Sequence, residues 1–261
     1  MRLIIVMYFL LLNISAANAK LGVFTVEEPP MSFTNKNGRV SGYSTSIVRT
    51  ILAKANIQAD IEIVPEARAI DMAKSNQEIL LFSFSRTPNR EDDFYWIGEL
   101  YRKDWMIYSL NSTPHHIKTI DDLRELEAIG VVRGDVREEW LLNKGFDNLV
   151  SLTHHQQSVQ MLLKQRLPVI AYGSAGIIST CQTLTLNCKK IKPILKLHQS
   201  SAYLLLSKTS MSLKHRAKLR TAYKALLHSG QMMAITKRWH DKLNKQNITV
   251  KIASDKPILQ F

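Results

Sequence analysis

The chain has 261 residues, of which 35 are Lys or Arg and 22 are Asp or Glu, so its formal net charge is +13. This length is enough for two modest lobes or one large domain, and the composition is ordinary for a globular protein. The basic residues are scattered and no recognisable nucleic-acid-binding module occurs, which excludes nucleic acid as the expected partner. Anionic ligands or anionic cell-surface polymers fit the charge.

The first nineteen residues predict a secretory signal peptide. Arg2 supplies the positive charge, residues 3–12 form a nearly unbroken apolar run, and Ala17-Asn18-Ala19 matches an A-x-A cleavage signal. The apolar run is short for a membrane span. We therefore expect a mature periplasmic chain that begins near Lys20, and the alternative is an uncleaved N-terminal anchor.

Two cysteines, Cys181 and Cys188, lie in the polar stretch TCQTLTLNCK. In an oxidising compartment the simplest interpretation is a local disulfide in a polar loop. A metal site needs more ligands than two thiols, and no HExxH, GxSxG or P-loop pattern occurs. The sequence therefore predicts no metal and no cofactor.

The hydrophobic pattern alternates strands with helices along the chain. In the first half it predicts strands at 21–26, 61–64 and 79–84, helices at 44–55 and 67–75, and extended segments at 94–97 and 105–110. A second alternation has strands at 129–132, 149–152 and 169–172, a short helix capped by Thr119 and Asp122, and helices that open at Gly134-Asp135, near Val159 and at Ser174. Extended segments at 191–197 and 203–206 are followed by helices at 213–227 and 232–243, which Ser229-Gly230 separates.

This pattern predicts a two-lobed, hinged α/β protein, in which each lobe is a mixed sheet flanked by helices. Extended crossovers near 99–107 and 197–204 join the two alternations. The expected division is residues 20–102 with 202–246 for lobe 1, residues 103–201 for lobe 2, and residues 247–261 as a polar tail with room for one added strand. The cleft between the lobes is then the default binding site.

The stretch LFSFSRTPNR carries the clearest binding signal. It is an apolar strand with Ser83 and Ser85 near its end, followed by a Thr-Pro-Asn turn and then Arg90. Ligands of open α/β sheets lie outside the carboxyl ends of strands, and Arg offers a planar set of donors that suits a carboxylate. Ser83, Ser85 and Arg90 are therefore candidate ligand contacts for a small anionic group.

Four stretches together resemble the periplasmic solute-binding proteins of the family-3 type, which serve polar amino-acid ABC importers. They are Glu28-Pro29-Pro30-Met31-Ser32-Phe33 with Asn37 to Tyr43, then SFSRTPNRE, then IGVVRGD at 129–135, and finally the closing helix pair with Lys237-Arg238-Trp239. They span nearly all of the mature chain in order. The resemblance implies the hinged type II periplasmic-binding-protein fold.

The resemblance also implies roles for single residues. Arg90 matches the Arg that grips a ligand carboxylate, with Ser83 and Ser85 beside it. Gly134 and Asp135 match the glycine-led helix start of lobe 2, whose N–H groups face an anion. Glu28 stands where many members place an aromatic ring.

One departure concerns the ligand's ammonium group. Amino-acid binders usually have an acidic residue at the end of the strand that corresponds to 169–172, where this chain has Tyr172-Gly173-Ser174. Ser44 and Ser46 stand where amino-acid binders often have a pair of acidic residues. We therefore do not expect a plain α-amino acid unless Glu27, Glu28 or Asp135 provides the missing negative charge.

Further candidates face the same cleft in this interpretation. Arg68 begins a helix after a strand, Arg133 precedes the glycine turn, and Tyr172 could stack on or hydrogen-bond a ligand. Convergence of Arg68, Arg90 and Arg133 would favour an anionic solute. The adjacent pairs His115-His116 and His154-His155 are interpreted as solvated residues, because neighbours in sequence seldom point at one metal.

The leading hypothesis is a monomeric protein that captures a small solute and delivers it to an inner-membrane ABC permease. The second hypothesis keeps the binding function and makes the output a signal to a membrane receptor. A third is a dehydratase-like enzyme on the same fold. Glu28 is the only evident general acid or base for such a reaction and no partner for it is evident, so we expect no enzyme.

Overall fold

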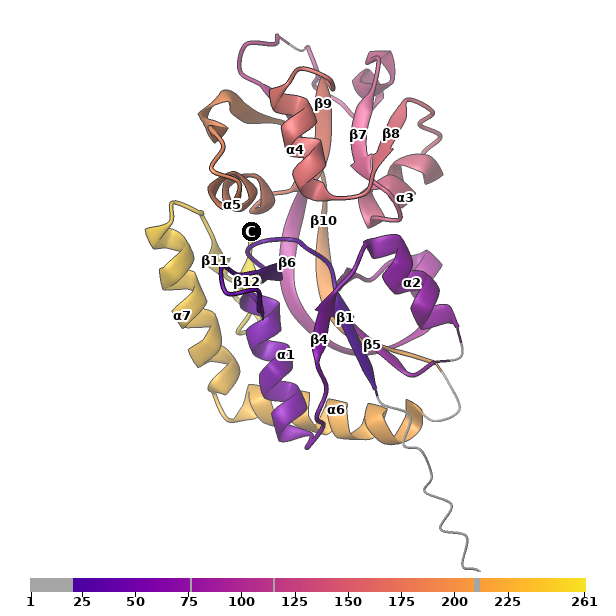
Figure 1. Cartoon of the computed structure of the whole chain (residues 1–261), viewed down its shortest axis with the longest axis vertical. Coiled ribbons are helices and arrows are strands. Elements are labelled where there is room, and N and C mark those ends of the chain that lie inside the picture. Colours follow the sequence, from indigo (N-terminus) through magenta and orange to yellow (C-terminus); the bar gives the residue numbers. More distant parts are fainter. Residues whose placement is uncertain (1–20, 76, 115, 209–211) are drawn as a thin grey trace, which may run out of the picture.

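Two long antiparallel strands, β6 (Phe94–Leu110) and β10 (Ile191–Ser207), run through both halves of the molecule in the computed structural model (Figure 1). The structure describes residues 21–75, 77–114, 116–208 and 212–261, so the predicted signal peptide lies outside it. The register between the two strands shifts at four places, from Pro193 to Leu205. Such bulges increase the local twist, which turns one half of the sheet relative to the other.

The half that we call lobe 1 is built on parallel strands β1 (Gly22–Thr25), β4 (Ile61–Ile63) and β5 (Ile79–Ser85). Helices α1 (Tyr43–Lys54), α6 (Ser212–His228) and α7 (Gln231–Lys245) share one hydrophobic cluster with the sheet, and α2 (Glu66–Lys74) contributes to another. The short strands β2 (Phe33–Thr34) and β3 (Val40–Ser41) form a hairpin, and β5 ends in the short 3₁₀ helix η1 (Pro88–Arg90). The amphipathic pattern of α1 explains its place, since Ile47, Val48, Ile51 and Leu52 are all buried.

Lobe 2 repeats the arrangement with parallel strands β7 (Ile129–Val132), β8 (Leu149–Leu152) and β9 (Val169–Gly173) as neighbours. Its helices are α3 (Val136–Asn143), α4 (His155–Leu163) and α5 (Gly176–Thr183), with 3₁₀ helices η2 (Asp121–Glu125) and η3 (Cys188–Lys190). The sheet order is β4-β1-β5-β10-β6-β9-β7-β8, so the sheets of the two lobes are continuous through β10 and β6. The predicted two-lobed α/β fold is confirmed, and the exact division between the lobes stays a prediction.

The predicted disulfide between Cys181 and Cys188 is present, with 5.8 Å between the two Cα atoms. Its predicted setting in a polar loop is wrong for Cys181, which is buried in α5. The helix begins at Gly176 and places Ile177 and Cys181 on the same side, toward the core of lobe 2, because they are four residues apart.

The last fifteen residues return to lobe 1. Strands β11 (Lys251–Ile252) and β12 (Leu259–Gln260) pair with each other, and β12 also pairs in parallel with β6. Ile258 and Leu259 are completely buried, and the Leu259 N–H donates to the hydroxyl of Tyr43 at 3.1 Å. The segment expected to be a polar tail therefore closes the core of lobe 1 with its few apolar residues.

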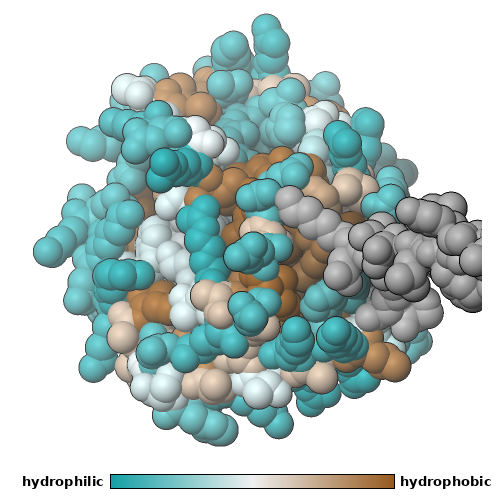
Figure 2. All heavy atoms as spheres, turned by 60° about the horizontal axis from the view of Figure 1, so that its bottom comes forward, coloured by the Kyte–Doolittle hydropathy of each residue, from teal (hydrophilic) through white to brown (hydrophobic). Residues whose placement is uncertain are grey.

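The end of lobe 1 that carries α6 is covered mainly by hydrophilic residues, with a smaller hydrophobic area in its centre (Figure 2). Leu213, at the start of α6, is among the most exposed large hydrophobic residues at 59%. Among the described residues, none of the helices is long and apolar enough to cross a membrane.

We expect Leu259→Ala to lower the free energy of unfolding by about 2–5 kcal/mol, because it removes fully buried methyl groups and leaves a cavity in the core. Chemical denaturation at neutral pH measures this change. Leu213→Ala is the matched control and should change the value by less than about 0.5 kcal/mol. Equal effects of the two substitutions would contradict the docking of the C-terminal strand.

Candidate functional site

A cluster of ionisable side chains, most of them buried, lies where the two lobes meet. We call it the inter-lobe ion cluster, and it consists of Glu28, Glu66, Arg90, Lys103, Asp135, Arg137, Glu139 and His155. The first three come from lobe 1, the last four from lobe 2, and Lys103 from the β6 strand that joins the lobes. Buried charges are costly unless they are paired, so the pairing within this group governs how the lobes meet.

Glu28 is the centre of one half of the cluster. Lys103 Nζ lies 2.6 Å from each carboxylate oxygen, and Arg137 Nη1 and Nη2 each lie 3.4 Å from Oε1. Burial alone raises the pKa of Glu28, but the charges of Lys103 and Arg137 outweigh it and hold the pKa below its ordinary value. Glu28 is therefore an ionised side chain that ties lobe 1 to lobe 2.

Asp135 and Arg137 form the lobe 2 side of the cluster. Asp135 is the N-cap of α3 and accepts from the Arg137 N–H at 2.7 Å, and its carboxylate also accepts from Arg137 Nε at 2.7 Å and from Nη2. Burial raises the pKa of Asp135, but the charge and hydrogen bonds of Arg137, together with the nearby charge of Lys103, hold the pKa well below its ordinary value. The predicted site residue Asp135 is thus already neutralised by Arg137.

His155 occupies the first turn of α4 and stacks on Tyr172, with ring centroids 4.6 Å apart. Burial and then the positive charge of Arg137 lower the pKa of His155 to about 4, so the ring is neutral at pH 7. The prediction that both members of His154-His155 are solvated is wrong for His155. The reason is that α4 begins four residues before Val159, which puts His155 on the same face as the buried Ser158 and Val159.

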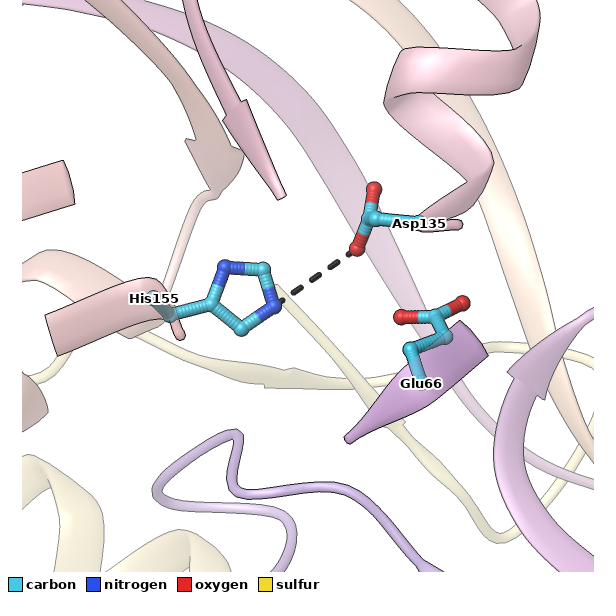
Figure 3. A group of neighbouring side chains, drawn as sticks. All are labelled: Glu66, Asp135 and His155. Atoms are coloured by element: carbon cyan, nitrogen blue, oxygen red, sulfur yellow. Dashed lines mark ion pairs between the residues drawn. The ribbon is translucent and has the colours of Figure 1, made fainter. Parts of the chain in front are cut away.

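Glu66, Asp135 and His155 converge from three different elements (Figure 3). One ligand atom from each lies within 4.8 Å of the others, a spacing that a metal ion could bridge. However, Arg137 donates to the Asp135 carboxylate and its Nη2 lies 3.4 Å from His155 Nε2. A cation would have to displace this guanidinium, so we assign no metal to the group.

Arg90 is 3% exposed, although it follows a surface turn. Its Nη2 donates to the carbonyl of Gly134 at 3.1 Å and to Glu139 at 2.5 Å, which are both in lobe 2. Its Nη1 lies 3.5 Å from Glu66 Oε1, and neither Nη1 nor Nε has a hydrogen-bond acceptor within the described part of the chain. Arg90 therefore bridges the lobes and still has two buried donors that lack acceptors.

Glu66 opens α2 with its side chain buried, and its only ion pair in the described structure is the 3.5 Å contact with Arg90. Burial and the nearby charge of Asp135 raise its pKa well above the ordinary value. Glu66 also lines a cavity of about 380 Å³, which we call the cleft pocket, together with Glu27, Val132, His154 and His155. This pocket lies between the carboxyl end of β1 and the start of α4.

The lobes touch closely beside this pocket. Gly134 has φ +71°, and a Cβ there would lie 3.0 Å from both Cα and Cβ of Ala67. A side chain at position 134 would thus be strained by its backbone and pressed against α2. The predicted glycine of lobe 2 is required for this close approach.

The other predicted site residues lie in different settings. Ser83, with φ +75°, hydrogen-bonds through its hydroxyl to Ser44 at 2.7 Å, inside lobe 1, and Ser85 reaches Ser200 at 3.1 Å. Tyr172 is fully buried and its hydroxyl lies 2.8 Å from Thr180 Oγ1. Arg68 and Arg133 are exposed. The structure thus brings Glu28, Arg90, Gly134, Asp135 and Tyr172 to one region and leaves Arg68 outside it.

Sequence reasoning missed Lys103, Arg137 and Glu139 and did not single out Glu66 as a site residue. A signal existed for Lys103, because Tyr101, Lys103 and Trp105 alternate with the less buried Arg102 and Asp104 along β6. For Arg137 the only sequence signal was its position, two residues after Asp135. Glu66 precedes Ala69 and Ala73 at helical spacing and so shares their buried face.

The family of the protein follows from its sequence. The model of the bacterial extracellular solute-binding proteins, family 3, matches residues 21–242, and the chain belongs to this family. No curated protein matched the sequence. The predicted family is therefore confirmed, and its members are binding proteins.

Solved structures share the fold at low identity. A histidine kinase sensor domain with similarity to periplasmic binding proteins has a TM-score of 0.75 and 16% identity, covering 84% of this chain and 95% of that one. An ancestral arginine-binding protein bound to arginine has a TM-score of 0.72 and 15% identity, covering 85% and 98%. The solute receptor for L-cysteine of Neisseria gonorrhoeae has a TM-score of 0.73 and 14% identity, covering 88% and 93%.

The pKa of His155 makes stability depend on pH. Because the folded-state pKa is about 4 and the unfolded one about 6.5, the unfolded chain binds a proton in this window and the folded one does not. The contribution of the neutral His155 ring to the free energy of unfolding is fully present above pH 6.5 and decreases as the pH falls toward 4. His155→Gln should lose this dependence, so the difference in unfolding free energy between the parent and the variant should shrink by about 2 kcal/mol from pH 7.5 to pH 5. The exposed His116→Gln is the control and should keep the parent's pH profile; an unchanged profile for His155→Gln would contradict the assignment.

Lys103→Met should lower the free energy of unfolding by about 3–5 kcal/mol, because it leaves the buried Glu28 with only the longer contacts to Arg137 and to the Tyr101 hydroxyl. The double variant with Glu28→Gln should recover part of this loss. Lys196→Met, which removes the half-exposed pair with Asp104, is the control and should cost less than about 1 kcal/mol. Denaturant titrations measure all three, and additive losses in the double variant would disprove the coupling.

Proposed function

We propose that this protein captures a small carboxylate-bearing solute between its two lobes in the periplasm and delivers it to an inner-membrane ABC permease. The single observation that carries the proposal is Arg90, whose Nη1 and Nε are buried at the lobe junction without acceptors in the described structure. Orphaned charged donors are expensive, and a solute carboxylate is the partner that compensates them best. The N-terminal turn of α3 adds a positive dipole end nearby.

The charges at the end of β9 favour a solute without an ammonium group. The end of β9 lacks a carboxylate, and a Cβ at Gly173 would lie 3.2 Å from Glu28 Oε1, so Glu28 of lobe 1 fills that space. Its charge is already compensated by Lys103 and Arg137. A solute's ammonium group would therefore compete with two fixed cations, whereas a carboxylate alone would not.

Closure in this proposal works through the same contacts. With the lobes apart, Glu28 and Arg90 lose their lobe 2 partners Arg137 and Glu139 and are solvated instead. When the lobes close, the solute and the opposite lobe together replace that water. The importer then recognises the closed, loaded form.

We expect Arg90→Ala to lower the affinity for the solute on the order of a hundredfold, because two charge-assisted hydrogen bonds are lost. The solute is first found by thermal shift with a panel of dicarboxylates, keto acids and amino acids, and its affinity is then measured by calorimetry. Arg90→Lys should recover only part of the affinity, since one ammonium cannot replace the guanidinium. The exposed Arg49→Ala is the control. Unchanged affinity in Arg90→Ala would contradict the proposal, and so would a panel in which no carboxylate raises the melting temperature.

A second candidate output is signalling, which the similarity to a histidine kinase sensor domain favours. In this case the loaded protein contacts a membrane receptor and no solute enters the cell through it. Deletion of the gene separates the two outputs: loss of solute uptake supports delivery to a permease. Normal uptake with loss of a solute-induced transcriptional response supports a sensor.

A further inference from the structure

A second cavity, of about 570 Å³, lies on another side of the lobe junction. We call it the η1–α3 pocket, because its walls include the turn at η1, helix α3, and the middle of β6 and β10. It shares no lining residue with the cleft pocket. Arg90 stands between the two, since its partner Glu66 lines the cleft pocket and its partner Glu139 lines the η1–α3 pocket.

The η1–α3 pocket is lined by several aromatic rings. Trp105 meets Trp140 edge to face with centroids 6.1 Å apart, and it lies 5.0 Å from the ring of His198. The rings of Trp140 and His198 are nearly parallel, with an interplanar angle of 22° and a centroid distance of 6.3 Å. The volume is within the range of small-molecule sites, and rings from both lobes can contact a flat ligand.

Two buried polar groups in this wall lack partners. The indole Nε1–H of Trp105 has no acceptor and the hydroxyl of Thr87 has no partner among the residues that the structure describes, although both residues line the pocket. A buried Trp N–H usually has a hydrogen-bond acceptor, so the absence of an acceptor for Trp105 among the described residues needs a physical explanation. A ligand with a hydrogen-bond acceptor at its ring edge supplies one.

The charges of the pocket are already paired. The guanidinium of Arg86 is bound by Glu91 and lies over the rings of Trp96 and Tyr203, and Glu139 is bound by Arg90. Neither charge needs an ion as a partner. The lining therefore favours a ligand that is uncharged, flat and equipped with acceptors over a cation or an anion.

We propose that the η1–α3 pocket binds an uncharged planar heteroaromatic compound of nucleobase size. The Trp105 N–H donates to a ring acceptor, Trp140 and His198 contact the ring, and amide and hydroxyl side chains of α3 and β10 satisfy its edge. Because Trp140 belongs to lobe 2 and Tyr203 to lobe 1, bound ligand stabilises this arrangement of the lobes. The site is distinct from the proposed solute site, and this inference does not rest on the proposed function.

Adenine and caffeine are suitable probes, with benzoate and benzylamine as an anionic and a cationic comparison. Quenching of the intrinsic tryptophan emission and saturation-transfer NMR on the full mature chain, at up to about 1 mM probe, measure binding. We expect saturable binding of at least one uncharged probe and at least tenfold weaker binding of the charged ones. Absence of saturable binding for both uncharged probes, or equal binding of the charged ones, would overturn the proposal.

Three variants locate the site. Trp140→Leu should weaken binding at least tenfold, because stacking on the indole is lost. Trp105→Phe keeps an aromatic ring but removes the N–H together with the pyrrole part of the indole, so it should weaken binding several-fold. Trp239→Phe, in α7, is the matched control and should bind as the parent does. Circular dichroism spectra verify that each variant is folded, and parent-like binding by folded Trp140→Leu would place the ligand elsewhere and refute the assignment.

Discussion

The pairing of Glu28 with Lys103 and Arg137 is the interaction on which the arrangement of the two lobes depends. Glu28 comes from the loop after β1, Lys103 from β6, and Arg137 from α3, and all three residues are at least 95% buried. Charges at this depth are tolerated only with their partners in place. The observed arrangement of the lobes is therefore stabilised by charge neutralisation across the junction, and Gly134 permits the close approach to Ala67.

This arrangement shapes both cavities at the junction. Arg137 neutralises Asp135 and shares Glu28 with Lys103, which leaves Arg90 as the cation with buried donors that lack acceptors in the described structure. Arg90 in turn contacts Glu66 beside the cleft pocket and Glu139 beside the η1–α3 pocket. A ligand that alters one of these contacts changes the pairing of the other, and this gives the two cavities a physical route for coupling.

Much of the fold could be predicted because its elements have strong local patterns. Ile47, Val48 and Ile51 mark α1 by helical spacing, and the run from Ile79 to Phe84 marks the buried strand β5. The C-terminal strand β12 was less evident, since two residues hold too little pattern to distinguish a strand from a loop. For the site, the ends of β5 and β7 indicated Arg90, Gly134 and Asp135. The sequence did not indicate Glu139 and Arg137, which pair with the charges of Arg90 and Asp135.

The sequence by itself determined the alternation of strands and helices, the disulfide between neighbouring cysteines, and the membership in the solute-binding family, because each depends on residues close together in the chain or on an ordered set of motifs. Only the tertiary structure decided which charges meet. Glu28 and Arg137 are 109 residues apart, and Arg90 and Glu139 are 49 apart. Such pairs leave no local pattern, since the free energy that selects them comes from burying opposite charges together when distant elements pack.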